Sequence, residues 1–252
     1  MNLHQNPAPM RSAGTDMHTN ADHSLYRLMS WLSPSFPVGA YSYSHGIEYA
    51  FDAGDVTNAD SLQTWVEGIL EFGAGRLDAV FFRAGWQAIT ERDNALLKWT
   101  IETAETMRAT KEMALESSAQ GEAFFDTLLN SWPVDGLDRI EFLRVELKRT
   151  ITYPVAVGIA SALSEIELHK ALEAYLHAFV SNLVSAGVRM IPLGQTAGQQ
   201  IISSLEIAVI EAVHSIMAET METLKANLGS GAVMVDWSSM KHETQYTRIF
   251  RS

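Results

Sequence analysis

Three groups of residues in this chain have types and spacings that could support chemistry. The segment from Ser42 to Gly46 reads Ser-Tyr-Ser-His-Gly and nearly matches the G-x-S-x-G turn that carries the nucleophile of α/β-hydrolases. That turn requires a strand before it and a helix after it. No segment upstream of Ser42 reads as a buried strand. The favoured interpretation is therefore a structural loop, and a hydrolase that uses Ser44 remains an alternative.

The second group is a series of carboxylate and imidazole side chains spaced four residues apart: Glu165, His169, Glu173 and His177. On a helix, such neighbours can share a divalent metal ion. The same pairs also occur on solvated helix faces, where each contributes only about 0.2–0.5 kcal/mol. Spacing alone specifies no metal, so we assign no metal ligand. A helical metal-binding protein or metalloenzyme stays open as the alternative function.

The third group, Ser238 and Lys241, matches the S-x-x-K element of penicillin-recognising enzymes, but the companion S-D-N and K-T-G elements do not occur in the chain. The sequence also contains neither G-x-x-x-x-G-K-[ST] nor G-x-G-x-x-G, which are the usual nucleotide-binding loops. The sequence therefore predicts no catalytic residue and no enzyme activity. Any nucleotide hydrolysis would be the work of a partner.

Composition limits the classes of partner. The formal net charge is −12 and there is no cysteine, which excludes disulfides and thiolate metal sites. An acidic surface repels the phosphates of nucleic acids. Residues 1–20 lack the apolar core of a secretory signal. The longest mostly apolar stretch that we identify, Tyr153 to Leu163, is too short to cross a bilayer. We expect a soluble, cytoplasmic protein that binds neither nucleic acid nor membrane.

Hydrophobic periodicity predicts an all-α fold. Apolar residues recur every three to four positions in at least five segments. Residues 1–22 show no such period and are expected to form a flexible tail, followed by one helical domain at 23–252. Expected helix starts are Thr57 or Asp60, the capping box of Ser164 with Glu167, and that of Thr196 with Gln199. Irregular structure is expected at 33–46, 131–138 and 229–239, and only 151–157, weakened by Pro154, resembles a strand.

The last thirteen residues, 240–252, differ from the acidic body. They contain Lys241, Arg248 and Arg251 against one acidic residue, interleaved with Tyr246 and Phe250. Arginine and aromatic side chains are enriched at the centres of protein interfaces. This composition predicts a partner-binding tail. Because the segment follows the last strong apolar stripe, we expect its deletion to leave the melting temperature nearly unchanged.

Three ordered segments resemble the urease accessory protein UreF family. Residues 33–48 are similar to the family pattern S-P-x-x-P-V-G-x-[FY]-x-[YF]-S-x-G-[LI]-E. Residues 189–199 resemble R-L-x-P-L-G-Q-T-x-G-Q, and residues 240–252 resemble M-R-H-E-T-Q-Y-S-R-L-F-R-S. The departures are conservative, such as Lys241 in place of Arg and Thr247 in place of Ser. The resemblance extends from about residue 25 to residue 252.

The resemblance implies an all-helical homodimer with no catalytic site and no resident cofactor. It implies that the protein joins a UreD-type accessory protein, also called UreH, and a UreG-type GTPase in loading nickel into apo-urease, so that nickel is handled transiently. In the family the terminal motif is associated with docking the UreD-type partner. The partner-binding residues carried over from the first and third motifs are Tyr41, Ser42, Ser44, Gly46, Glu48, His242, Glu243, Thr244, Gln245, Tyr246, Arg248, Phe250 and Arg251.

Overall fold

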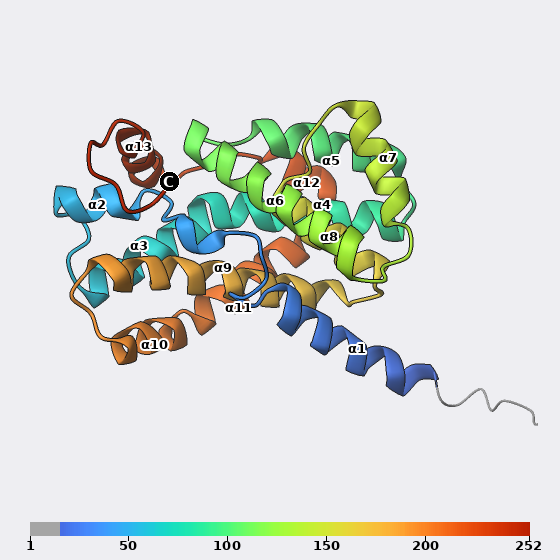
Figure 1. Ribbon diagram of the computed structural model, residues 1–252, viewed down its shortest axis with the longest axis horizontal. Helices are drawn as coiled ribbons and strands as arrows, with labels where there is room; N and C mark the ends of the chain where they lie inside the picture. Colours follow the sequence, from blue (N-terminus) through green and yellow to red (C-terminus); the bar gives the residue numbers. More distant parts are fainter. Residues whose placement is uncertain (1–15) are drawn as a thin grey trace, which may run out of the picture.

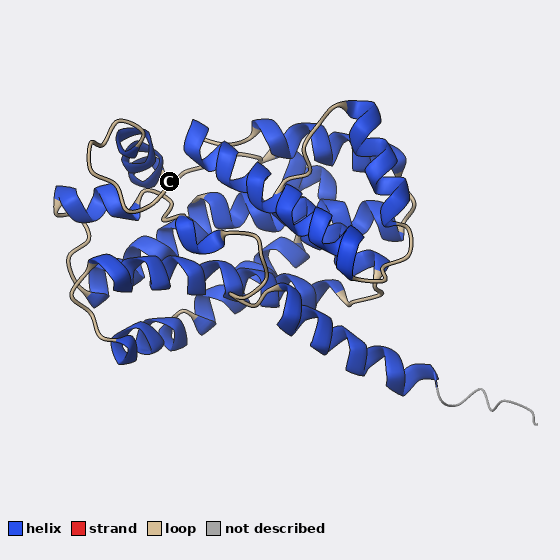
Figure 2. Ribbon diagram, in the orientation of Figure 1, coloured by secondary structure: helices blue, strands red, loops and turns tan. Residues whose placement is uncertain are grey.

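The computed structural model describes residues 16–252, with side chains from residue 23 onward. Within this range the chain forms helices and connecting loops, and it contains no strand (Figures 1 and 2). The all-α prediction is confirmed. The predicted flexible tail lies largely outside the described residues, although helical backbone already begins at Asp16.

The elements follow one another with short connections. Their bounds are α1 Asp16–Trp31, the 3₁₀ turn η1 Ala40–Ser42, α2 Ile47–Ala53, α3 Ala59–Phe72, α4 Ala74–Thr90, α5 Asn94–Thr106, α6 Lys111–Ser131, α7 Leu137–Leu147, α8 Tyr153–Leu163, α9 Leu168–Met190, α10 Gln195–Ser204, α11 Glu206–Ala218, α12 Met221–Ala226 and α13 Val233–His242.

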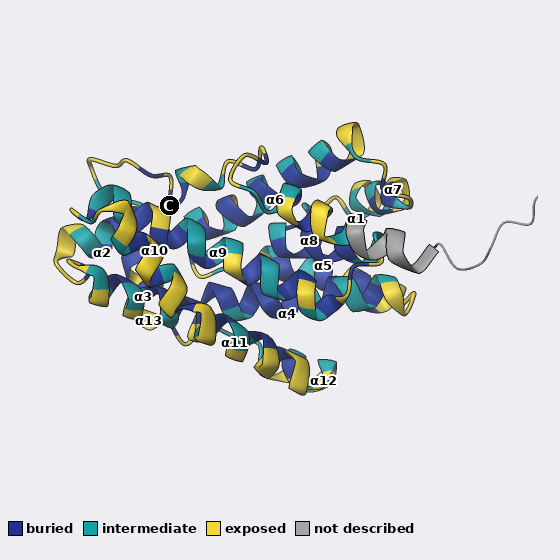
Figure 3. Ribbon diagram, turned by 90° about the horizontal axis from the view of Figure 1, so that it is seen from below, coloured by how far each residue is buried: buried dark blue, intermediate teal, exposed yellow. Residues whose placement is uncertain are grey.

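Helices α4 and α8 form the centre of the core, where Figure 3 shows mostly buried positions. Gly158 of α8 lies directly against the Phe82 carbonyl of α4, so the two backbones pack without an intervening side chain. The strand-like segment 151–157 is helical from Tyr153 onward, and Pro154 occupies the first turn of α8. Proline is favoured there because the first helical N–H groups have no partner within the helix. The suggestion of a strand is therefore wrong.

The predicted helix starts are also corrected. Ser164 ends α8, and Glu165 takes a left-handed backbone conformation (φ 55°) that reverses the chain before α9. The expected capping box of Ser164 with Glu167 therefore does not form. Helix α10 begins after Gly194 without a side-chain cap, so the second box is also absent. Asn58 caps α3, in place of Thr57 or Asp60.

Two further segments differ from expectation. Residues 229–232 are irregular as predicted, but α13 begins at Val233.

The longest apolar helical stretch is Gln195–Ala218, which is long and apolar enough to span a bilayer by length and composition alone. The prediction that 153–163 is the longest is therefore wrong. A turn at Leu205 divides the stretch into α10 and α11, and Val209 and Val213 of α11 pack into the core. Of the most apolar 18-residue window in this stretch, 28% is buried inside the described structure.

The arrangement of the ends matters for the site. Helix α1 extends from the body at one end, while α2, α13 and the carboxyl terminus gather at the other (Figure 1). Figure 3 shows exposed positions along α10, α11 and α12 on the side seen from below.

Candidate functional site

Three segments that are far apart in the sequence meet at the end of the body formed by α2 and α13. The first motif supplies η1 and the start of α2, the second supplies the end of α9, and the third supplies the end of α13. Residues 243–252 follow α13, and we call them the strap. The strap returns across α2, where the backbone N–H of Ser44 donates to the Ser252 carbonyl at 2.8 Å. The three motifs therefore build one site.

Arg189 joins all three motifs. Its guanidinium carbon lies 3.6 Å from the ring centroid of Tyr41 and 4.4 Å from that of Phe250. Its Nη1 also donates to the backbone carbonyl of Tyr41 at 2.8 Å. A guanidinium held between two aromatic faces gains cation–π attraction from both. The side chain thereby ties the end of α9 to the loop before α2 and to the strap.

Glu48 holds the strap from the first turn of α2. Its two carboxylate oxygens accept the backbone N–H groups of Ile249 at 2.6 Å and Phe250 at 2.9 Å. The carboxylate is buried, so these charge-assisted hydrogen bonds face little competition from water. The peptide N–H of Arg251 adds a bond to the Ser42 carbonyl at 2.7 Å. The strap is thus fixed mainly through its backbone.

His242 connects α13 to two carboxylates. Its side chain is 0% exposed, with Nε2 3.1 Å from Glu48 and Nδ1 2.6 Å from Glu112 of α6. Glu112 also accepts Nη1 of Arg248 at 2.6 Å. Buried polar groups are costly unless they are paired, and here each ring nitrogen faces an acceptor. The network of Glu48, His242, Glu112 and Arg248 fixes α2, α6, α13 and the strap together.

Gly46 allows α13 to approach α2. Its φ of +76° lies in the left-handed region, and a Cβ there would lie 2.6 Å from the backbone nitrogen of Ser239. Ser44, two residues earlier, also donates its hydroxyl to the Ser252 carbonyl. Both residues are buried. In the first motif, they therefore shape the contact between α2, α13 and the strap.

The expectation that residues 240–252 add little to the folded body is wrong. Five of the predicted partner-binding residues are buried, and they hold the strap in place: Ser44, Gly46, Glu48, His242 and Phe250. The backbone of the strap is bonded to the loop and to α2 at several points. Composition indicated a surface segment because polar residues usually remain solvated. Here their pairing across long sequence separations allows burial.

The remaining predicted residues face outward or lie at the edge of the site. Tyr41 is 67% exposed, Tyr246 is fully exposed, and Thr244, Arg248 and Arg251 are also exposed. Ser42, Glu243 and Gln245 are half-buried. The bonds from Lys111 N–H to Glu243 at 2.9 Å and from Gln245 to Asp52 at 2.6 Å secure the edge. The strap and the adjoining η1 therefore present an exposed surface, which we call the outer face of the strap and define as Tyr41, Tyr246, Ile249 and Arg251.

Sequence reasoning missed several residues of the site. Arg189 stood in the second motif but was not carried over as a site residue. Glu112 and Glu116 of α6 belong to no motif, yet Glu116 accepts the hydroxyl of Ser252 at 2.8 Å. No sequence signal marks these glutamates among the other acidic residues. The place of Arg189 at the start of the second motif was the one signal available.

The hydrolase alternative finds no support in the geometry. The hydroxyl of Ser44 is buried and bonded to the strap, and the described chain has no strand before it. Ser238 is likewise fully buried. Neither serine presents its oxygen to a substrate. The proposed nucleophile turn is instead the loop that receives the end of the strap.

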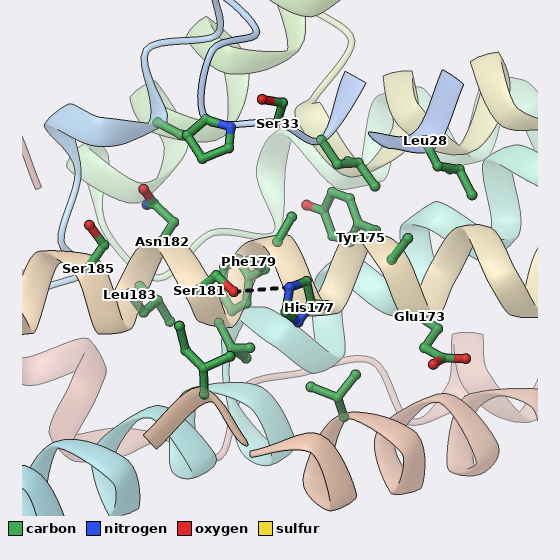
Figure 4. A pocket seen from close by; sticks show the side chains of 18 of the residues that line it. Leu28, Ser33, Glu173, Tyr175, His177, Phe179, Ser181, Asn182, Leu183 and Ser185 are labelled. Carbon is green, nitrogen blue, oxygen red and sulfur yellow. Dashed lines mark hydrogen bonds between the residues drawn. The ribbon is translucent and has the colours of Figure 1, made fainter. Parts of the chain in front are cut away.

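The four-membered Glu/His series does not form either. Glu165 lies in the turn before α9, whereas His169 Nδ1 lies 3.7 Å from Glu173. The His169 ring packs at a tilt of 50° against that of His214 of α11, with 5.6 Å between the ring centroids. Glu173 and His177 line a cavity of about 1550 Å³, and His177 Nε2 lies 3.5 Å from the hydroxyl of Ser181 (Figure 4). Among the side chains of residues 23–252, no group of three or more His, Asp or Glu is placed to hold a metal ion.

His45 lies beneath the strap and also lines this cavity. Its Nδ1 is 3.2 Å from Glu116, and its ring packs edge-on against Phe179. Burial opposes the charged imidazolium, but the charge and hydrogen bonding of Glu116, aided by Asp78, outweigh burial and the opposing charge of Arg108. The pKa of His45 is therefore raised above its ordinary value.

This raised pKa predicts a pH-dependent contribution to stability. A histidine whose folded pKa is raised stabilises the fold fully below its unfolded pKa of about 6.5, and that contribution is lost as pH rises through the folded pKa. We expect His45→Asn, which tolerates the left-handed backbone at this position (φ 53°), to destabilise the protein most at acidic pH. Urea unfolding of the wild type and of His45→Asn, at pH values below and above about 6.5, measures the difference in their free energies of unfolding. A difference that grows as pH rises would contradict the assignment.

Comparisons with known proteins identify the family of this chain. The sequence profile of the UreF family matches residues 56–206, which extend from the connection between α2 and α3 to the first residue of α11. A urease accessory protein UreF of Rhodopseudomonas palustris (strain BisB5) is 44% identical over 246 residues, covering 97% of this chain and 98% of the relative. The UreF of Bradyrhizobium diazoefficiens is 41% identical over 94% of this chain and 95% of its own length.

A third relative, the urease accessory protein UreF of Magnetococcus marinus, is 41% identical and covers 92% of this chain and 100% of its own length. These proteins are named as accessory proteins of urease and not as the enzyme itself. Their alignments extend over nearly the whole chain, well beyond the segment matched by the family profile. The chain belongs to the UreF family of urease accessory proteins.

Proposed function

We propose that this protein is a scaffold for urease maturation. It binds a UreD-type (UreH) accessory protein and a UreG-type GTPase, and it presents them to apo-urease so that nickel can be inserted. Nickel is the cargo of this assembly and not a resident cofactor of the chain. The observation that carries the proposal is the outer face of the strap, where exposed Tyr246 and Arg251 are held on a backbone anchored by buried Glu48.

The strap is preorganised for binding. A disordered peptide loses conformational freedom when it binds, and that loss reduces affinity. The strap is already fixed to α2 and the loop before it through Glu48 and Ser42. Most of its conformational entropy is therefore lost when the protein folds and not when a partner binds. Tyrosine and arginine offer large contact areas and strong hydrogen-bond donors, which are the features of interface anchors. We infer that the outer face docks the UreD-type partner.

The chain would depend on its partners for chemistry. It has no phosphate-binding loop, so GTP hydrolysis falls to the GTPase. The GTPase needs a scaffold that holds it against apo-urease. A helical body with a fixed binding face suits that task. We further propose that the protein works in the cytoplasm as a homodimer, which would present two outer faces. The apolar side chains exposed on α1, including Leu25 and Met29, offer area for such contacts.

The proposal is tested by co-expression and capture. A tagged copy of this chain is expected to retain both the UreD-type protein and the UreG-type GTPase through washing, without an added metal. An unrelated helical protein of similar acidity serves as the control for non-specific attraction. If the two candidate partners retain each other but neither is retained by this chain, the scaffold role is refuted.

A further inference from the structure

A second apolar surface lies between α3 and the start of α13. It is a groove of about 650 Å³ whose apolar lining comes from Trp65 and Phe72 on α3 and from Val233 and Met234 on α13. Trp237 continues the same face of α13 one turn further on. Phe72, Val233, Met234 and Trp237 are between 49% and 72% exposed. A contiguous exposed apolar patch, unlike single exposed side chains, marks a surface that binds something.

The rim of this groove is acidic. Residues 54–75, which include α3, contain four Asp or Glu side chains and no Lys or Arg. Asp55 and Asp60 line the groove directly. Glu67 and Glu71 follow Asp60 at helical spacing and therefore lie along the same flank of α3. The nearest basic side chain on α13, Lys241, stacks over the Trp237 ring at 4.4 Å. An acidic rim around an apolar floor complements a ligand that is apolar and basic.

Gly68 stands in the middle of α3 on the floor of the groove. Glycine inside a helix costs about 1 kcal/mol relative to alanine. Its backbone is not left-handed, and a Cβ added to it would have no neighbour within 4 Å. Gly75 differs, because a Cβ there would lie 2.6 Å from the Leu70 Cα. No contact with residues 23–252 therefore requires glycine at position 68, whereas the close approach of a partner's backbone would require it.

The indole N–H of Trp65 adds an independent observation. Trp65 lines the groove beside Gly68, and its nitrogen has no hydrogen-bond acceptor within the described chain. Buried donors in folded proteins are nearly always paired. A partner that settles into the groove can supply this acceptor after a small rotation of the ring.

We propose that the α3–α13 groove receives an amphipathic helix from a partner protein, with an apolar face flanked by Lys or Arg side chains and its backbone passing over Gly68. The acidic rim disfavours the other occupants. A second copy would bring the same carboxylates to a self-complementary contact, and nucleic acids or anionic membranes would be repelled. This surface goes beyond the proposed function because it shares no residue with the outer face of the strap.

Binding of a synthetic probe tests the proposal on the full-length protein. The probe is a helix of about four turns, with leucines at positions i, i+3, i+4 and i+7 and arginines beside them. A matched peptide carries glutamates in place of the arginines. We expect the arginine peptide to bind at least about tenfold more tightly, as measured by fluorescence anisotropy, and its affinity to fall as salt is added.

Variants locate the binding. Gly68→Leu fills the floor and is expected to weaken the arginine peptide at least about tenfold. Gln200→Leu places the same side chain at an exposed position of α10 and should leave the affinity unchanged. The double variant Asp60→Asn with Glu71→Gln should weaken binding and flatten its salt dependence. Gly68→Ala favours the helix, so its melting temperature should not fall below that of the wild type. It should nevertheless bind the arginine peptide less tightly, which separates an effect on docking from an effect on folding.

Other results would overturn the proposal. These are equal binding of the two peptides, no binding of either, or equal loss in Gly68→Leu and Gln200→Leu. A change of oligomeric state in Gly68→Leu, measured by sedimentation, would identify the occupant as a second copy instead. Because Tyr246 and Arg251 lie outside the groove, loss of partner capture in strap variants with retained peptide binding would separate the two surfaces.

Discussion

Replacing Glu48 by alanine is expected to lower the free energy of unfolding by about 3–5 kcal/mol, because it breaks a buried charged network on one side only. The substitution leaves the N–H groups of Ile249 and Phe250 without their acceptor. It also leaves Nε2 of fully buried His242 facing an empty space. Urea unfolding monitored by circular dichroism measures the loss. Glu48→Gln, which keeps one acceptor oxygen, should fall between alanine and the wild type.

A matched control distinguishes this anchor from surface pairing. Asp52 lies one turn further along α2 and accepts a hydrogen bond from Gln245 of the strap, but it is exposed. Asp52→Ala should therefore cost less than about 1 kcal/mol. Removal of residues 243–252 should be at least as damaging as Glu48→Ala, in contrast to the expectation from composition. Equal, small losses in Glu48→Ala and Asp52→Ala would show that the strap is not anchored by a buried carboxylate.

The double variant Tyr246→Ala with Arg251→Ala is expected to reduce capture of the UreD-type partner at least about tenfold, as hot-spot side chains do at other interfaces. Both side chains are exposed and contribute little to packing, so the free energy of unfolding should change by no more than about 0.5 kcal/mol. Arg248 is left intact because its ion pair with Glu112 also supports the fold. Titration of the partner onto the immobilised chain at two salt concentrations measures the effect.

The control for that variant removes the same kinds of side chain elsewhere. Phe142 of α7 and Lys98 of α5 are both exposed and lie outside the strap. Phe142→Ala with Lys98→Ala should retain the wild-type affinity. If the control loses as much affinity as the strap variant, general surface attraction explains the capture. If neither loses affinity, the outer face of the strap is not the docking surface.

The helices could be predicted from the sequence wherever one apolar stripe faces the core. Leu62, Val66 and Ile69 illustrate this on α3, where the period is unbroken and the side chains are fully buried. Helix ends were harder to predict, because they depend on single backbone conformations. Glu165 adopts a left-handed conformation that glutamate rarely takes. The capping box expected between Ser164 and Glu167 therefore does not form. Helix was not predicted for residues 233–239 because apolar side chains lie on both faces of α13: Val235 is buried, whereas Val233 and Trp237 are exposed, which obscures the helical period.

The strap could be predicted as a special segment but not as a folded one. Its aromatic and basic residues stand out against the acidic body, and the motif resemblance marked Glu48 and His242 separately. Nothing in the sequence showed that these two side chains meet at 3.1 Å, because they are 194 positions apart. Glu112 was not marked at all. Burial of a polar segment depends on partners brought together by the tertiary fold, and composition carries no information about that pairing.

The most direct test of the account is the nickel content and activity of urease in cells that lack their own copy of this protein. Wild-type chain supplied in trans is expected to restore both quantities. Tyr246→Ala with Arg251→Ala should restore neither, although the variant accumulates to the wild-type level, and Phe142→Ala with Lys98→Ala should restore both. Urease that acquires nickel equally well with the strap variant would contradict the claim that this protein acts through the outer face of its strap.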